Sequence, residues 1–170
     1  MALRACPICR EPHHRLGRRS VLRALGAAPR ALAAVVRGAS VRALRRRPAR
    51  GEWSATEVIG HLLDAELTLG FRIRKAAAEP GSPMVAWDQD AWGEALRHRR
   101  GDARGMLAAY AALRSANLAQ VARLSPAQRQ HGGRHPAYGP LRITQLLGHW
   151  AEHDLNHLAQ VRSALRAIRG

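Results

Sequence analysis

Aromatic side chains are scarce in this chain of 170 residues, which contains four Trp, two Tyr and one Phe. Alanine, leucine and valine must therefore fill the core, and alanine and leucine are strong helix formers. The chain also lacks any segment long and apolar enough to span a membrane, any alternating strand pattern and any internal repeat. Its length suits one domain with a single core. These absences leave all-α as the expected fold class.

Cysteine occurs only twice, at Cys6 and Cys9, in a C-x-x-C spacing followed closely by His13 and His14. A zinc site usually needs a second pair of ligands, which one or both of these histidines could supply. A redox motif would need a strand before it and a helix after it, and neither pattern is visible. We expect residues 1–18 to be a basic, disordered tail, and a small metal site in it remains the alternative.

Lysine is almost absent, since Lys75 stands beside 27 arginines. Together with the abundance of alanine and glycine, this skew is typical of a GC-rich coding bias. The net charge of +16 would suit a nucleic-acid-binding protein, but residues 1–50 hold 13 of the arginines against a single acid. Because the rest of the chain is near ordinary in charge, we do not expect it to bind nucleic acid. A basic tail that binds phosphate or anionic lipid is the alternative.

A twin-arginine pattern at Arg18–Arg19 is similar to an export signal. Such a signal needs a continuous apolar stretch, and here Arg23, Pro29 and Arg37 interrupt it. We therefore expect an amphipathic helix at this place, a cytoplasmic protein and no membrane association.

Four long helices are expected from the spacing of apolar residues. A capping box at Ser54 and Glu57 marks the start of the second helix, and Pro29 is expected to kink or divide the first. Residues 81–100 are irregular and predict a long crossover between the second and third helices, and residues 130–140 predict a turn-rich loop. The expected helices are 20–44, 55–79, 103–124 and 144–168. This pattern predicts a four-helix bundle over residues 19–170.

Histidines spaced by four residues are the clearest chemical signal. His149, His153 and His157 lie on one face of the last helix, and two imidazoles one turn apart can bind one ion. Three in a row span too far for all to reach it, so one pair binds and the third is a neighbour. A further ligand would come from the facing helix, where His61 is the candidate. The alternative is a surface stripe of polar residues.

Two segments, residues 48–66 and 153–160, resemble the first and last motifs of the DinB-like superfamily, and the last one has the form H-x-x-x-H-x-x-Q. Residues 135–139 and 141–147 also resemble segments of this superfamily, so the resemblance covers about residues 20–168. It implies a four-helix bundle with one unusual crossover. It also implies a divalent metal ion, zinc or nickel, held by His61, His153 and His157. His149 matches a position that is often polar and is expected to neighbour the ligands.

Each ligand imidazole should donate its second N–H to a partner. Asp64, three residues after His61, and Gln160, three residues after His157, are the candidates by spacing. Three histidine ligands would leave coordination positions open for water or substrate, as in catalytic zinc sites. We see no serine or cysteine triad, so the chemistry should run through the metal, and the catalytic residues stay unassigned. Glu57, Asp64 and Glu152 are candidate bases.

The resemblance implies a metal-dependent hydrolase or a transferase that uses a low-molecular-weight thiol, held by the metal as a thiolate. A small-molecule substrate is therefore the expected partner, and in the case of the transferase a thiol is expected as well. Two other hypotheses are a non-catalytic, metal-stabilised module whose basic N-terminal region binds nucleic acid, and a homodimer formed through a helix face.

Overall fold

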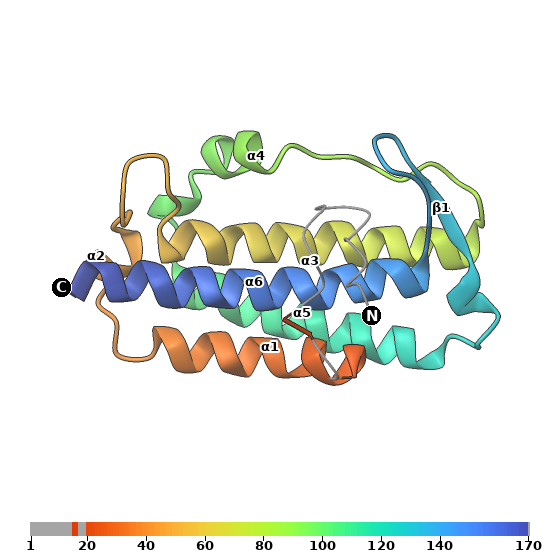
Figure 1. Ribbon diagram of the computed structural model, residues 1–170, viewed down its shortest axis with the longest axis horizontal. Helices are drawn as coiled ribbons and strands as arrows, with labels where there is room; N and C mark the ends of the chain where they lie inside the picture. The colour runs from red at the N-terminus through yellow and green to blue at the C-terminus, as the bar shows by residue number, and fades with distance from the viewer. Residues whose placement is uncertain (1–14, 17–19, 170) are drawn as a thin grey trace.

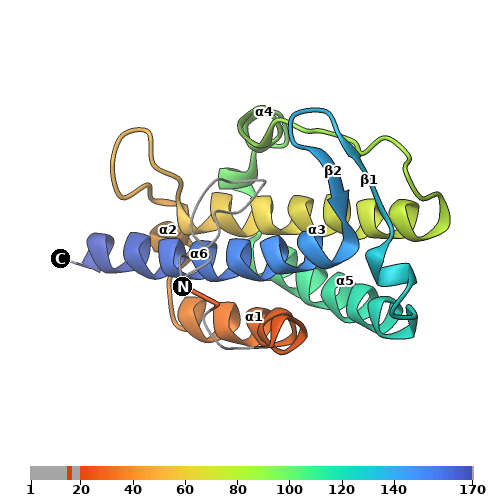
Figure 2. The same ribbon diagram turned by 45° about the vertical axis from the view of Figure 1, so that its right-hand side comes forward.

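A bundle of four long helices forms the body of the computed structural model, which describes residues 15–16 and 20–169 (Figures 1 and 2). Helices α1 and α3 each pack against both α5 and α6. The contact between α3 and α6 brings together the two helices that carry the candidate metal ligands. Within the described residues, no helix has the length and apolarity that a membrane crossing would need. The long helices are α1 (Val21–Val36), α3 (Ala55–Ala78), α5 (Ala103–Arg123) and α6 (Ile143–Arg169). The all-α four-helix bundle is thereby confirmed.

Short elements fill the connections between the long helices. Helix α2 (Val41–Arg45) follows α1, and α4 (Gln89–Ala95) with the 3₁₀ turn η1 (His98–Arg100) lies in the crossover between α3 and α5. This crossover runs along the outside of α3 in both views (Figures 1 and 2). A second 3₁₀ turn, η2 (Gln128–Gln130), precedes the two strands before α6. The long connection between the second and third long helices is as predicted.

The first long helix differs from the expectation of one helix over residues 20–44. Helix α1 continues through Pro29 to Val36, and the break falls at Gly38, whose φ of +75° lies outside the right-handed helical region. The chain then starts α2 at Ser40, whose side chain accepts a hydrogen bond from the Ala43 amide. Pro29 therefore does not divide the helix, and the glycine does.

Residues 130–140 form more than a loop. Strand β1 (Gly132–His135) pairs antiparallel with β2 (Gly139–Arg142), and the three residues between them make the turn. The expectation of no strand was wrong because strands of four residues, rich in Gly and Pro, leave no alternation to detect. Gly139 has a φ of +70°, which a glycine adopts without strain at the end of such a short hairpin loop.

The hairpin is fastened to the crossover as well as to α6. The Arg134 amide donates to the Ser82 carbonyl over 2.9 Å, and the Met84 amide donates to the Arg134 carbonyl over 2.8 Å. A Cβ atom at Gly133 would lie 2.6 Å from the Ser82 carbonyl oxygen, so this close approach requires glycine. The hairpin and the crossover therefore hold each other over one side of the bundle.

A buried charged layer divides the core into two apolar clusters. Arg114 of α5 is 1% exposed and bonds Glu66 of α3 and Asp154 of α6, over 2.9 and 2.5 Å. It also donates to the Leu25 carbonyl of α1 over 2.9 Å. Along each long helix, one apolar cluster lies before this layer and the other after it. One guanidinium thus ties all four long helices together.

Candidate metal centre

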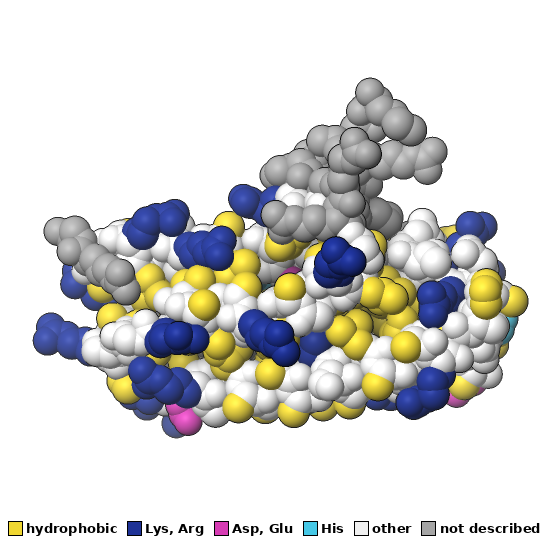
Figure 3. Space-filling model, turned by 90° about the horizontal axis from the view of Figure 1, so that it is seen from below, with side chains coloured by type: hydrophobic (Ala, Val, Ile, Leu, Met, Phe, Trp, Pro, Cys, Tyr) yellow, Lys and Arg dark blue, Asp and Glu magenta, His cyan; other side chains and the backbone are white. Residues whose placement is uncertain are grey.

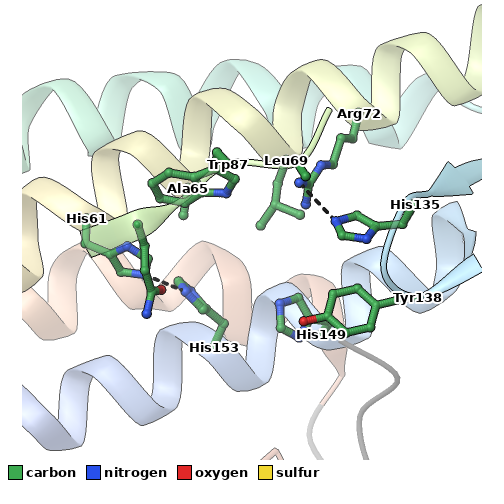
Figure 4. Close-up of a pocket in the computed structure, with 11 residues that line it drawn as sticks. His61, Ala65, Leu69, Arg72, Trp87, His135, Tyr138, His149 and His153 are labelled. Atoms are coloured by element: carbon green, nitrogen blue, oxygen red, sulfur yellow. Dashed lines mark hydrogen bonds between the residues drawn. The ribbon is translucent and has the colours of Figure 1, made fainter. Parts of the chain in front are cut away.

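Three histidines from two helices meet on one side of the bundle. His61 lies on α3, and His153 and His157 lie one turn apart on α6. One ring nitrogen of each falls within 4.8 Å of the others. The Nε2 atoms of His61 and His153 are 2.9 Å apart, and Figure 4 shows the two rings pointing at each other. These are the three residues that the family resemblance implies as metal ligands, and the fold brings them together.

A hydrogen bond at His157 selects Nε2 of that residue as the nitrogen available for a ligand. Gln160 Oε1 lies 2.7 Å from His157 Nδ1, so that nitrogen carries the proton and Nε2 keeps its lone pair. The Nδ1 atoms of His61 and His153 are buried without a hydrogen-bond partner among residues 15–16 and 20–169. Three imidazole nitrogens that converge in this way are a donor set that zinc, nickel and copper accept. The residues present therefore fit a divalent ion.

The environment keeps these imidazoles neutral. Burial, and then the neighbouring imidazoles, lower the pKa of His61 and His153 far below the usual range. Burial also lowers the pKa of His157, although its contact with Gln160 and the charge of Asp154 act the other way. A neutral imidazole offers a lone pair that a protonated one lacks, so the cluster is prepared to bind a cation.

The spacing had suggested that Asp64 accepts a hydrogen bond from the second N–H of His61, but it does not do so in the structure. Its Oδ2 lies 2.6 Å from Nε2 of His98, a residue of η1, and the two form a buried pair. Gly60 makes room for this pair, because a Cβ there would lie 2.5 Å from the His98 ring. The spacing of three residues puts Asp64 on the right side of α3 but does not decide which way its carboxylate turns.

The other two candidate bases are also held by the protein. Glu57 accepts hydrogen bonds from Ser54, in the predicted capping box, and from Arg47. Burial alone would raise the pKa of Glu57, but these hydrogen bonds outweigh it and lower the pKa. Glu152 accepts from the backbone amides of Arg15 and Leu16. Each of the three carboxylates therefore already has a protein partner.

A pocket of about 340 Å³ opens beside the histidine cluster, and we call it the site pocket (Figure 4). His61 and His153 lie at one end of this pocket, and His149 lies next to them. The ring centroids of His149 and His153 are 5.7 Å apart. The wall contains Ala65, Leu69 and Trp87, and the other end contains Arg72, His135 and Tyr138. No pattern in the sequence distinguishes Arg72 from the other 26 arginines.

Two tryptophans enclose His61. The Trp87 ring, from the crossover, stacks on His61 with 5.4 Å between centroids, and the Trp53 ring lies at 5.1 Å on a tilted plane. Trp87 thus forms part of the pocket wall as well. These rings limit the access of water to the ligand candidates. The predicted cluster of Cys6, Cys9, His13 and His14 lies outside the described residues.

Comparison with known proteins agrees with this geometry. The family model described as the DinB superfamily matches residues 24–161. "Putative metal-dependent hydrolase OB0782" of Oceanobacillus iheyensis is 26% identical over 113 residues, which are 66% of this chain and 65% of the relative. "Putative metal-dependent hydrolase YfiT" of Bacillus subtilis is 25% identical over 119 residues, 69% of this chain and 67% of the relative. The chain thus spans about two thirds of the length of both relatives.

A solved structure shows the same fold. The structure of YfiT from Bacillus subtilis, whose description is "a probable metal-dependent hydrolase with an unusual four-helix bundle topology", aligns with a TM-score of 0.81. The alignment covers 86% of this chain and 84% of that chain, at 23% identity. At such an identity, the likeness is evidence for the fold alone.

Proposed function

This chain belongs to the DinB superfamily, and from that premise we propose that it is a metal-dependent hydrolase of a small molecule. The observation that carries the proposal is the convergence of three neutral imidazoles, two of which, His61 and His153, line the site pocket. His61, His153 and His157 would hold the ion, which we expect to be zinc or nickel. When bound, such an ion lowers the pKa of a coordinated water to about 7 and polarises the bond under attack.

The side chains around the cluster give the site its remaining properties. Gln160 orients His157 through the 2.7 Å contact with Nδ1, which is the usual task of a residue behind a metal ligand. Trp53 and Trp87 shield His61 on two sides. His149 lines the same pocket beside His153, so we assign it the transfer of a proton to or from the substrate.

Activity should follow the metal. We would assay ester and amide hydrolysis by the purified protein, by protein stripped with a chelator, and by stripped protein reloaded with zinc or nickel. We expect activity to disappear on stripping and to return on reloading. His149→Gln should retain the ion and lose turnover. Hydrolysis that survives complete removal of the metal would contradict the proposal.

A transferase that uses a low-molecular-weight thiol stays a prediction from the family resemblance. The hydrolase and the transferase share the ion and differ in the nucleophile, water in one and thiolate in the other. The same assay with cysteine-containing thiols added distinguishes them by product. A thioester product would favour the transferase, and a carboxylic acid product would favour the hydrolase.

A further inference from the structure

An arginine buried at the far end of the site pocket has no role in the proposed metal chemistry. Arg72 lies on the same face of α3 as His61, and the residues between them on that face, Ala65 and Leu69, line the pocket wall. Eleven residues of helix separate the two Cα atoms by about 16 Å. Arg72 is 5% exposed, so its charge is held inside the protein and faces the pocket.

The charge of Arg72 has no acidic partner among residues 15–16 and 20–169. Its guanidinium donates from Nε to the Val85 carbonyl over 2.9 Å, and Nη2 bonds the same oxygen. These bonds fasten the crossover, but a carbonyl does not neutralise a cation. Burial lowers the pKa of Arg72, although a guanidinium stays protonated in proteins. A buried cation without an anion is costly, and a site for a negatively charged ligand would explain the cost.

His135 adds a second donor at the same place. Its Nδ1 accepts a hydrogen bond from the Ala137 amide over 3.2 Å, so the proton of the neutral ring lies on Nε2. Nε2 is 3.5 Å from Nη2 of Arg72, too long for a good hydrogen bond. Burial and the charge of Arg72 lower the pKa of His135, which keeps the ring neutral. Two N–H groups therefore point at one part of the pocket.

Tyr138 completes this end of the pocket. Its ring stacks on His135 with 4.6 Å between centroids, and both residues belong to the hairpin, His135 at the end of β1 and Tyr138 in the turn before Gly139. In Figure 4 the Tyr138 hydroxyl points away from the hairpin, toward the side of the pocket where His149 lies. Arg72, His135 and Tyr138 thus line the pocket with N–H and O–H groups from α3 and from the hairpin.

We propose that Arg72, His135 and Tyr138 form a subsite for a carboxylate of the substrate. The subsite carries one cation beside neutral donors, which matches the single charge of a carboxylate, whereas a phosphate dianion is usually met by more than one cation. The wall of Ala65, Leu69 and Trp87 suits an apolar spacer. Resting on the proposed function, this inference makes the substrate an acid whose cleaved bond lies at the metal and whose carboxylate lies at Arg72.

The test compares two probes of the same shape and different charge, phenylacetate and phenylacetamide. We would measure their binding to the metal-loaded full chain by calorimetry, for the wild type, Arg72→Gln and the exposed control Arg123→Gln. We expect the wild type to prefer phenylacetate by at least about tenfold, as a charge-assisted hydrogen bond implies. Arg72→Gln should lose the preference and Arg123→Gln should keep it. Equal binding of both probes by the wild type would overturn the inference.

Two further arms separate this subsite from the metal and from a folding defect. His157→Ala removes a ligand candidate that does not line the pocket, so the preference should survive in it even if the proposed function fails. Its disappearance there would place the carboxylate on the ion and overturn the subsite. In the wild type, phenylacetate should shift the Arg72 Nε–H resonance in NMR spectra, and Tyr138→Phe should weaken its binding severalfold. An unmoved resonance, or benzylphosphonate binding more than about tenfold tighter than phenylacetate, would also contradict the assignment.

Discussion

One imidazole of the cluster is oriented through its other nitrogen. His157 has Gln160 as its partner there, whereas the Nδ1 atoms of His61 and His153 are buried without a partner in the described part of the chain. The Nδ1 of His153 lies 3.9 Å from Asp154, whose carboxylate Arg114 holds. Gln160 is therefore the residue through which ligand orientation can be tested with the least disturbance.

Replacing Gln160 should weaken metal binding without abolishing the site. We expect Gln160→Met to lower the affinity for zinc by about 10- to 100-fold, the usual effect of losing such a partner. Competition with a chromogenic zinc chelator measures it. Gln120→Met on α5 is the matched control and should bind zinc like the wild type. Equal affinity of the two variants would show that Gln160 does not orient His157.

The metal-free protein should lose stability as the pH falls through the histidine range. Burial lowers the pKa of His61, His153 and His157, so below about pH 6.5 the unfolded chain takes up protons that the folded chain refuses. Above that pH the three neutral histidines do not lower the free energy of unfolding. As the pH falls below it, the free energy of unfolding should decrease by about 1 kcal/mol per pH unit for each group. Urea unfolding between pH 7.5 and 5.5 measures the slope.

The matched variant for this slope is His153→Asn, which removes one of the three groups and should give a shallower dependence on pH. Asp64 and Glu66 act in the opposite direction, because burial raises the pKa of both and protonation at low pH then favours the folded state. A stability that is independent of pH across this window would show that the histidines are not kept neutral by burial.

At the scale of the elements, the crossover is fitted to α3 by a single glycine. A Cβ at Gly60 would lie 2.5 Å from the His98 ring, and His98 is the partner of Asp64. Gly60→Ala should therefore destabilise the fold by about 1–3 kcal/mol through overpacking, although alanine is the better helix former. Chemical denaturation of the metal-free protein measures the change.

Gly148 of α6 is the matched control, because nothing lies within 4 Å of a Cβ built there. Gly148→Ala should stabilise the protein by up to about 1 kcal/mol, the ordinary preference for alanine in a helix. If both glycine substitutions stabilised the protein, His98 would not be fixed against α3 in solution.

The elements that local chemistry specifies were predictable, and those specified by contact with the rest of the fold were not. The capping box at Ser54 marked the start of α3, because its two hydrogen bonds lie within four residues. The hairpin was not predicted, because contacts outside its own strands help to specify it: β1 pairs with β2 and is also hydrogen-bonded to the crossover at Ser82. Among the site residues, spacing marked His149, His153 and His157 without deciding which two bind, and the family resemblance implied His153 and His157. Arg72 matters only because the hairpin brings His135 to it.

At the scale of the whole molecule, the buried guanidinium of Arg114 holds the bundle together. Burial alone would lower the pKa of Arg114, but its hydrogen bond to Asp154 and the charges of Asp154, Tyr110 and Glu66 together outweigh burial and raise the pKa. Arg114→Met would leave Glu66 and Asp154 buried without their cation, and breaking such a pair costs about 3–5 kcal/mol. Urea unfolding should show this loss, with Arg123→Met near the wild type. A loss below about 1 kcal/mol would contradict the role of this layer.

The nucleic-acid alternative also belongs to the whole molecule. On the face in Figure 3, the arginine side chains lie apart, with hydrophobic and uncharged atoms between them. We therefore expect any DNA binding to be weak, to fall steeply with salt and to depend on the arginines of residues 1–50. A variant in which these arginines are replaced by glutamine and which still bound DNA as tightly as the wild type would contradict this expectation. The homodimer and the cytoplasmic location stay predictions.

The most direct test of the central claim is the metal content of the purified, untagged protein, measured by mass spectrometry. The wild type is compared with His61→Ala, His153→Ala, His157→Ala and a Cys6→Ser/Cys9→Ser double variant. The account predicts about one equivalent of a divalent metal in the wild type and in the cysteine variant, and its loss in each histidine variant. Metal that follows the cysteines instead, or that stays after the histidines are removed, would contradict the site on α3 and α6.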